Sequence, residues 1–155
     1  MAIEIGAAAP SFDLPVNGGG RFALADQLGK PVVLYFYPKD LTSGCIKEAE
    51  SFRDLHTEFQ AAGAVVVGAS RDPVKKHDQF VSKYDLPFPL LADEDGSLCE
   101  AYGVWVEKSM YGRSYMGIER TTVLIDRDGR VAQVWPKVKV AGHAAAVLDA
   151  VKALG

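Results

Sequence analysis

The run of residues 32–37, with the sequence VVLYFY, limits the possible folds more than any other part of the chain. It contains only β-branched, aromatic and leucine side chains, carries no charge, and lies between Pro31 and Pro38. A strand with one face in solvent alternates apolar with polar residues, whereas this run is apolar on both faces. It therefore predicts a strand in the interior of a sheet that is covered on both sides.

The segment after Pro38 has the spacing of an amphipathic helix. Apolar side chains recur three and four residues apart, at Ala49, Phe52, Phe59 and neighbouring positions, and Gly63 follows as a C-cap. We predict a helix that begins near residue 43 or 44 and ends before Gly63. A helix directly after a buried strand is the repeating unit of α/β proteins.

The remaining patterns extend this arrangement. We predict an N-terminal hairpin (residues 11–24), a buried strand (64–70), a helix with Pro73 in its first position (to about 84), a short strand (88–92), a short helix capped by Asp93 or Asp95 (to 102), a strand pair (121–126 and 131–135) and a final helix (144–154). This order predicts an α/β protein with a thioredoxin-like fold, in which helices flank a central mixed sheet. The hairpin and an insertion over residues 86–119 are additions to that fold, and residues 1–155 are expected to form one domain.

Composition and charge exclude several classes of partner. Seventeen Lys and Arg residues against twenty Asp and Glu residues give a net charge of −3, and neither sign forms a long block. Nucleic acid is not an expected partner, because a phosphate backbone attracts a basic face. The apolar runs are far shorter than the roughly 20 residues that span a bilayer, and the N-terminal segment lacks the basic region of a secretory signal. We therefore predict a cytoplasmic protein without a membrane partner.

The chain has two cysteines, Cys45 and Cys99, and a reducing compartment would leave them unpaired. Cys45 falls at the start of the helix that follows the central strand, where free N–H groups and the helix dipole favour a thiolate. Lowering the pKa of a thiol by about two units takes roughly 2.7 kcal/mol, whereas a helix N-terminus supplies about 2 kcal/mol at most. A reactive Cys45 thus requires a further positive charge. The alternative is a small, inert, buried side chain.

The residues before Cys45 carry a recognisable motif. Pro38, Thr42 and Cys45 match the pattern Pro-x-x-x-Thr-x-x-Cys, and further matching stretches are Ala9–Pro15, Tyr35–Asp40, Tyr102–Val104 and Gly117–Arg120. On these residues the chain resembles the peroxiredoxins, and over nearly its whole length the peroxiredoxin Q group, also called bacterioferritin comigratory proteins. The resemblance implies a thiol-dependent peroxidase that reduces hydrogen peroxide and organic hydroperoxides and needs no cofactor, metal included.

The resemblance also implies a role for each matching residue. Cys45 matches the peroxidatic cysteine, which becomes a sulfenic acid, and Arg120 matches the arginine that supports its thiolate. Thr42 would hydrogen-bond the peroxide, Pro38 would shield the thiolate from water, and Glu48 would orient the arginine. For these four residues the alternatives are, in turn, a surface ion pair for Arg120, a helix cap for Thr42, the end of a strand for Pro38 and an exposed helical glutamate for Glu48.

The chain departs from the family pattern in two places. Ser43 stands where the family has proline, and both usual positions of a resolving cysteine lack one: Glu50 occupies the first, and residues 80–83 cover the second. Cys99 remains, and we expect it to be a structural, half-buried residue, with a resolver as the alternative. This predicts a one-cysteine mechanism in which an external thiol (thioredoxin, glutaredoxin or glutathione) reduces the sulfenic acid.

This interpretation has four alternatives. A thioredoxin-like disulfide reductase is disfavoured because the chain has no Cys-x-x-Cys pair. A cysteine hydrolase or a metal site is disfavoured because the histidines, His56, His77 and His143, are scattered. A non-catalytic binding or holdase domain with a passive Cys45 is the remaining alternative. In solution we expect a monomer, with a weak dimer as the alternative.

Overall fold

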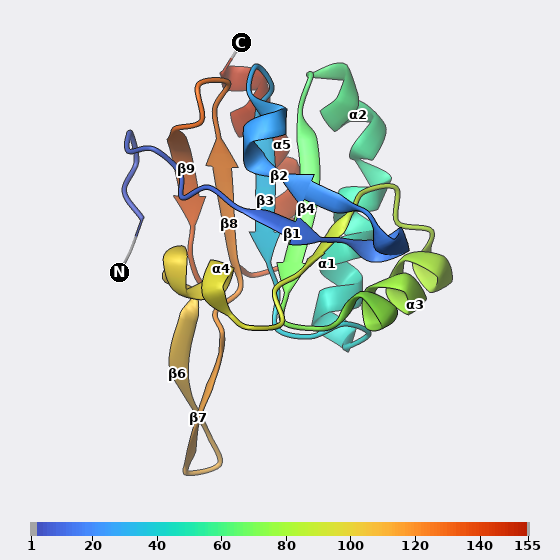
Figure 1. Ribbon diagram of the computed structural model, residues 1–155, viewed down its shortest axis with the longest axis vertical. Helices are drawn as coiled ribbons and strands as arrows, with labels where there is room; N and C mark the ends of the chain where they lie inside the picture. The colour runs from blue at the N-terminus through green and yellow to red at the C-terminus, as the bar shows by residue number, and fades with distance from the viewer. Residues whose placement is uncertain (1–2, 155) are drawn as a thin grey trace.

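The computed structural model describes residues 3–154 and has a five-stranded mixed sheet at its centre, in the order β5-β4-β3-β8-β9 (Figure 1). Its strands are β3 (Val32–Phe36), β4 (Val65–Ser70), β5 (Leu90–Ala92), β8 (Thr121–Ile125) and β9 (Val131–Trp135). The first three run parallel to one another, and β8 runs antiparallel to both β3 and β9. The predicted interior strand is confirmed, because β3 is the middle strand and all of its residues are buried.

Four helices cover one face of the sheet. They are α1 (Ser43–Asp54), α2 (His56–Ala61), α3 (Val74–Tyr84) and α5 (His143–Ala153). Apolar residues of these helices, among them Phe52, Phe80 and Val147, pack in one buried cluster with Val33 and Tyr35 of β3. In Figure 1, α5 lies behind the sheet.

The other face is covered by the N-terminal hairpin and the insertion. Strands β1 (Asp13–Pro15) and β2 (Arg21–Ala23) cross in front of the sheet in Figure 1, and α4 (Ser97–Ala101) lies beside them; two short 3-10 turns, η1 (Asn17–Gly19) and η2 (Leu24–Gln27), complete this region. Phe22 and Cys99 pack there against Leu34 and Phe36 of β3. Since successive residues of a strand point to opposite faces, β3 contributes alternate side chains to two separate cores. The thioredoxin-like α/β fold predicted from the element order is thus the fold observed.

Three elements differ from the predictions. The helix expected to continue to Gly63 is interrupted at Leu55, whose backbone is not helical (φ −101°, ψ 3°), so α1 and α2 are separate. Pro73 is the N-cap of α3 rather than its first helical residue. Within the insertion, β6 (Trp105–Met110) and β7 (Arg113–Ile118) form a projecting hairpin that was not predicted. Its strands are mostly exposed and therefore lack the alternation that marks a half-buried strand.

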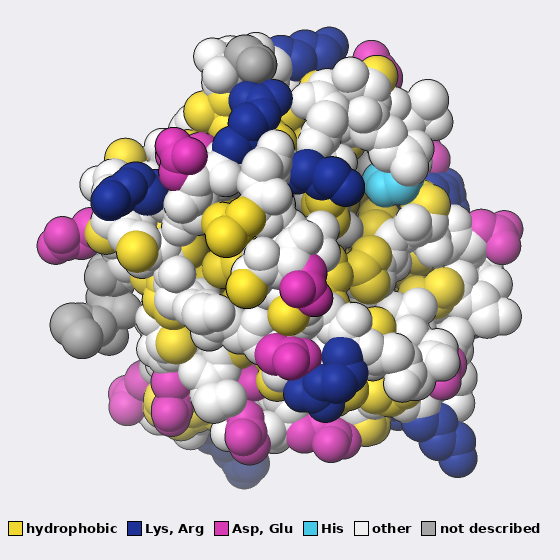
Figure 2. Space-filling model, turned by 45° about the horizontal axis from the view of Figure 1, so that its top comes forward, with side chains coloured by type: hydrophobic (Ala, Val, Ile, Leu, Met, Phe, Trp, Pro, Cys, Tyr) yellow, Lys and Arg dark blue, Asp and Glu magenta, His cyan; other side chains and the backbone are white. Residues whose placement is uncertain are grey.

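The surface of the molecule mixes both charges. On the face drawn in Figure 2, basic and acidic side chains are interspersed with one another and with apolar groups. Across residues 3–154, no helix has the length and hydropathy needed to cross a membrane.

Candidate active site

Cys45 lies near the start of α1, the helix that follows the central strand β3 in the chain. The strand β3 ends at Phe36, and Cys45 is the third residue of α1. The first bond of this helix runs from the N–H of Ile46 to the carbonyl of Thr42 (2.8 Å), so the N–H groups of residues 43–45 precede the helical ladder. The sulfur is thus placed at the positive end of the helix dipole. The residue is 1% exposed, which keeps competing water away from the thiol.

The side chain of Arg120 contacts the sulfur directly. Arg120 immediately precedes β8, which pairs antiparallel with β3 so that Thr121 lies opposite Phe36. The start of β8 is therefore beside the end of β3, and the arginine meets the first turn of α1. Its Nη2 donates to Sγ of Cys45 at 3.4 Å. This supplies the further positive charge that a reactive thiolate requires, and it excludes a surface ion pair as the only role of Arg120.

Glu48 holds the other side of the same guanidinium. It lies one helical turn after Cys45, and its Oε1 accepts a hydrogen bond from Nη1 of Arg120 at 2.6 Å. The alternative of an exposed glutamate is wrong, because Glu48 is 1% exposed. Burial raises its pKa to about 7, although the charge and hydrogen bond of Arg120 act in the opposite direction. Near neutral pH this carboxyl group is therefore close to its titration midpoint.

Thr42 and Pro38 belong to the loop that leads into α1. Thr42 occupies the N-cap position of α1, yet its hydroxyl donates to the carbonyl of Lys39 (2.8 Å) rather than capping the helix. Pro38 is half-buried and lines a groove of about 510 Å³. The five predicted site residues thus lie at one end of the sheet, three of them linked by the contacts of Arg120.

A buried polar network anchors this loop, and no pattern in the sequence indicated it. Asp40 accepts a hydrogen bond from the Tyr37 hydroxyl (2.6 Å), and its other oxygen lies 2.6 Å from Nδ1 of His77 on α3. The Nε2 atom of His77 contacts the carbonyl of Leu91 (2.8 Å). Because a carbonyl only accepts, Nε2 carries a hydrogen. The network ties the loop before Thr42 to α3 and β5.

The groove that Pro38 lines is bounded by the β6–β7 hairpin. Its other lining residues include Trp105, Lys108, Met116 and Ile118 of the hairpin, together with Arg71 after β4. The Arg71 guanidinium stacks on the Trp105 ring, 4.5 Å from the ring centroid. Sequence reasoning missed Lys108 as a site residue because it missed the strand that carries it. We call this cavity the Lys108 groove.

Cys99 lies on the opposite face of the sheet from Cys45. Cys45 packs in the cluster that contains Tyr35, whereas Cys99 packs in the cluster that contains Leu34 and Phe36. Both thiols are free. Burial and then a hydrogen bond with Asp93 raise the pKa of Cys99 well above its usual range. The expectation of a half-buried residue is wrong in degree, since Cys99 is 0% exposed. A disulfide between the two would require displacement of a sheet layer.

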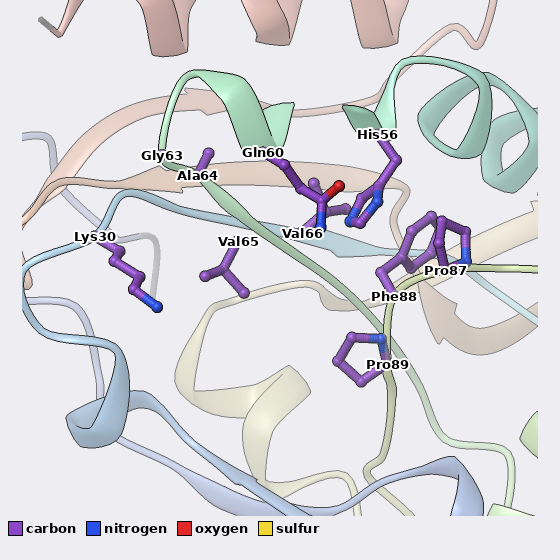
Figure 3. A pocket seen from close by; sticks show the side chains of 10 residues that line it. All are labelled: Lys30, His56, Gln60, Gly63, Ala64, Val65, Val66, Pro87, Phe88 and Pro89. Carbon is purple, nitrogen blue, oxygen red and sulfur yellow. The ribbon is translucent and has the colours of Figure 1, made fainter. Parts of the chain in front are cut away.

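A second cavity, of about 430 Å³, lies at the other end of the sheet. It is lined by residues that precede β3 and β4, among them Lys30 and Gly63, and by His56 and Phe88 (Figure 3). None of the predicted site residues lies there. Among residues 3–154, no group of three His, Cys, Asp or Glu side chains is arranged to hold a metal ion.

Comparison with known proteins shows the family of the chain. The model of the AhpC/TSA family matches residues 5–134. Peroxiredoxin Bcp of Bacillus subtilis is 49% identical over 152 residues, which cover 98% of this chain and 97% of the relative. Peroxiredoxin Bcp of Xanthomonas campestris is 51% identical over 147 residues, which cover 94% of this chain and 92% of the relative. One solved structure is that of the Xanthomonas campestris bacterioferritin comigratory protein, described for its alkyl peroxide reduction activity. It superposes with a TM-score of 0.91 at 48% identity, and the match covers 98% of this chain and 97% of that chain.

Proposed function

Because the chain belongs to the AhpC/TSA family and is a peroxiredoxin, a thiol-dependent peroxidase, we propose that Cys45 is its peroxidatic residue. Arg120, Glu48, Thr42 and Pro38 complete the proposed site. The observation that carries this assignment is the 3.4 Å contact between Nη2 of Arg120 and Sγ of Cys45 at the N-terminus of α1. A thiolate at this position is stabilised by the helix dipole and by a permanent cation together.

The proposed reaction transfers two electrons from sulfur to the peroxide. The Cys45 thiolate attacks the terminal oxygen of a hydroperoxide, an S–O bond forms and the O–O bond breaks. The products are a Cys45 sulfenic acid and an alkoxide or hydroxide, which takes up a proton to leave as an alcohol or water. Hydrogen peroxide and organic hydroperoxides are the proposed substrates. The alkyl peroxide activity described for the Xanthomonas campestris relative supports the organic class.

Each surrounding residue has a part in this step. The guanidinium of Arg120 stabilises the negative charge, which begins on sulfur and ends on the leaving oxygen. Glu48 fixes the plane of the guanidinium through its 2.6 Å bond. The Thr42 hydroxyl donates to Lys39, so its oxygen has lone pairs left to accept the hydrogen bond of the peroxide O–H group. Pro38 excludes water from one side of the sulfur.

We propose a one-cysteine cycle that an external thiol completes. The burial of Cys99 on the far face of the sheet supports this proposal, because Cys99 lacks a path to Cys45 through the packed β3 layer. Thioredoxin, glutaredoxin and glutathione are the candidate reductants. Since every cycle consumes two reducing equivalents from external thiols, a compartment rich in reduced thiols, such as the cytoplasm, is the proposed location.

Mass spectrometry after oxidation tests this assignment. Wild-type protein and a Cys99→Ser variant are treated with one equivalent of hydrogen peroxide and then with a reagent that traps sulfenic acids. We expect the trapped group on Cys45 in both proteins and equal turnover with an external thiol. An intramolecular bond between Cys45 and Cys99, or loss of turnover in the Cys99→Ser variant, would contradict the one-cysteine cycle. A Cys45→Ser variant that still consumes peroxide would contradict the role of Cys45.

A further inference from the structure

The Lys108 groove contains positive charge that is not neutralised by the protein. Lys39, Arg71 and Lys108 all line it, and within the part of the chain that the structure describes none of them forms an ion pair. Two acidic residues also line the groove. Oδ2 of Asp72 accepts hydrogen bonds from the Asp40 N–H and the Ser70 hydroxyl, which hold this carboxylate in place but leave its negative charge. Glu94 is exposed. Three cationic side chains against two carboxylates leave the groove with a net positive charge, which suits an anionic group.

Lys108 lies on the hairpin whose second strand leads to Arg120. The residue is half-buried on β6, and its Cδ and Cε atoms lie beside Gly117 of β7, the strand that leads to Arg120. Burial and the positive charge of Arg120 lower the pKa of Lys108, whereas the negative charges of Glu119 and Cys45 raise it. Pro38 belongs both to the groove and to the loop before Cys45. The groove thus adjoins the loop that leads into α1 and Cys45.

The shape of the groove favours a small occupant over a protein. A cavity of about 510 Å³ has the size of a small-molecule site. Its apolar wall, formed by Trp105, Met116 and Ile118, would contact an aliphatic chain, and its lysines would pair with carboxylates.

We propose that the Lys108 groove binds an anionic low-molecular-weight thiol, the reductant of the oxidised enzyme, with its carboxylates on Lys108 and Lys39. This inference rests on the proposed one-cysteine function. The bound thiolate attacks the sulfur of the Cys45 sulfenic acid, a disulfide forms, and the hydroxyl leaves as water after taking up a proton. A second thiolate attacks the external sulfur of that mixed disulfide. It releases the Cys45 thiolate and a disulfide of the two small thiols, so the two electrons given to the peroxide are restored.

The test compares three thiols of different charge. Wild-type protein is oxidised with one equivalent of hydrogen peroxide, and its sulfenic acid is confirmed by trapping. The rate of reduction is then measured with glutathione, which is anionic, with 2-mercaptoethanol, which is neutral, and with cysteamine, which is cationic. Each rate is divided by the rate at which the same thiol reduces a small disulfide, so that differences in intrinsic reactivity are removed. The proteins compared are wild type, Lys108→Gln, Lys108→Arg and the control Lys75→Gln, which changes an exposed lysine on α3.

We expect the ratio of the glutathione rate to the 2-mercaptoethanol rate to fall about two- to fivefold in Lys108→Gln. The ratio should persist in Lys108→Arg and Lys75→Gln, and it should fall in wild type as salt is added. A ratio that is unchanged by Lys108→Gln would overturn the inference. It would also be overturned if the rates of the three small thiols followed only their own nucleophilicity, while thioredoxin, measured in parallel, reduced the oxidised protein much faster. If no sulfenic acid forms on Cys45, the proposed function itself fails, and the trapping step shows this separately.

Discussion

Gly44 and Arg120 are in such close contact that a Cβ atom at position 44 would lie 3.1 Å from Nη2 of the arginine. That nitrogen is the one that donates to Sγ of Cys45. The absence of a side chain at Gly44 therefore allows the guanidinium to lie against the first turn of α1. Gly44 is a positioning residue, because it acts on the sulfur through Arg120.

A Gly44→Ala substitution should separate Arg120 from Cys45 while leaving the helix intact. Alanine favours a helix more than glycine does, so stability should change by no more than about 1 kcal/mol. The displaced guanidinium should slow oxidation of Cys45 by hydrogen peroxide about tenfold. Stopped-flow measurement of thiol loss at pH 7 gives the rate. The neighbouring Ser43→Ala variant, at an exposed position, is the control, and equal rates for both variants would remove Gly44 from this role.

Thr42→Val tests whether the hydroxyl acts in the reaction. Valine keeps the shape of threonine but removes the hydroxyl, whose oxygen is free to accept from the peroxide. We expect oxidation of Cys45 to slow about 100-fold. A Thr42→Ser variant retains the hydroxyl and should keep most of the rate. If the serine variant is as slow as the valine variant, the methyl group rather than the hydroxyl is important.

Glu48→Gln should alter the pH dependence of stability. Folding raises the pKa of Glu48 from 4.5 to about 7, so the folded protein binds this proton more tightly than the unfolded protein does. Its contribution to stability is complete below pH 4.5 and is lost as the pH rises through about 7. The free energy of unfolding of wild type, relative to Glu48→Gln, should thus fall by up to about 3 kcal/mol between pH 5 and 8.

Urea unfolding of both proteins at several pH values measures this difference. The control is Glu58→Gln, which removes an exposed carboxylate from α2, and its profile should follow that of wild type. Parallel profiles for wild type and Glu48→Gln would show that Glu48 does not titrate in this range.

His77→Ala should destabilise the protein strongly, because it leaves the buried Asp40 carboxylate without its histidine partner. Leaving a buried carboxyl group without its hydrogen-bond partner costs about 1–3 kcal/mol, and the cavity left by the imidazole adds to this loss. His56→Ala, at a half-buried position on α2, should cost about 1 kcal/mol or less. Equilibrium unfolding in urea compares the two. Equal losses would mean that the Asp40–His77 contact contributes little to the loop that precedes Thr42.

Much of the site could be predicted from sequence because most of it is contiguous. Pro38, Thr42, Cys45 and Glu48 lie within eleven residues that join a buried strand to a helix, so local patterns place them together. Arg120 was found through a family motif, and the structure explains its position by the antiparallel register of β3 and β8. The buried strand itself was predictable since both of its faces are apolar.

The parts that escaped prediction depend on contacts between distant residues. Asp40 and His77 are far apart in sequence, and a lone histidine in a helix carries no sign of a buried partner. The hairpin that carries Lys108 turns at Tyr111 and Gly112, which both have positive φ, but its exposed strands lack an apolar alternation. The separation of Cys45 from Cys99 follows from the alternation of β3 side chains between two cores, which becomes visible only when the layers are known.

In the proposed reaction, Arg120 activates the Cys45 thiolate to break an O–O bond. The second-order rate constant for loss of the Cys45 thiol on mixing with hydrogen peroxide tests it most directly. We expect a rate constant at least about 1000-fold above that of free cysteine, which corresponds to roughly 4 kcal/mol of transition-state stabilisation. Most of this gain should disappear in an Arg120→Met variant. A wild-type rate constant equal to that of free cysteine would contradict this activation of Cys45.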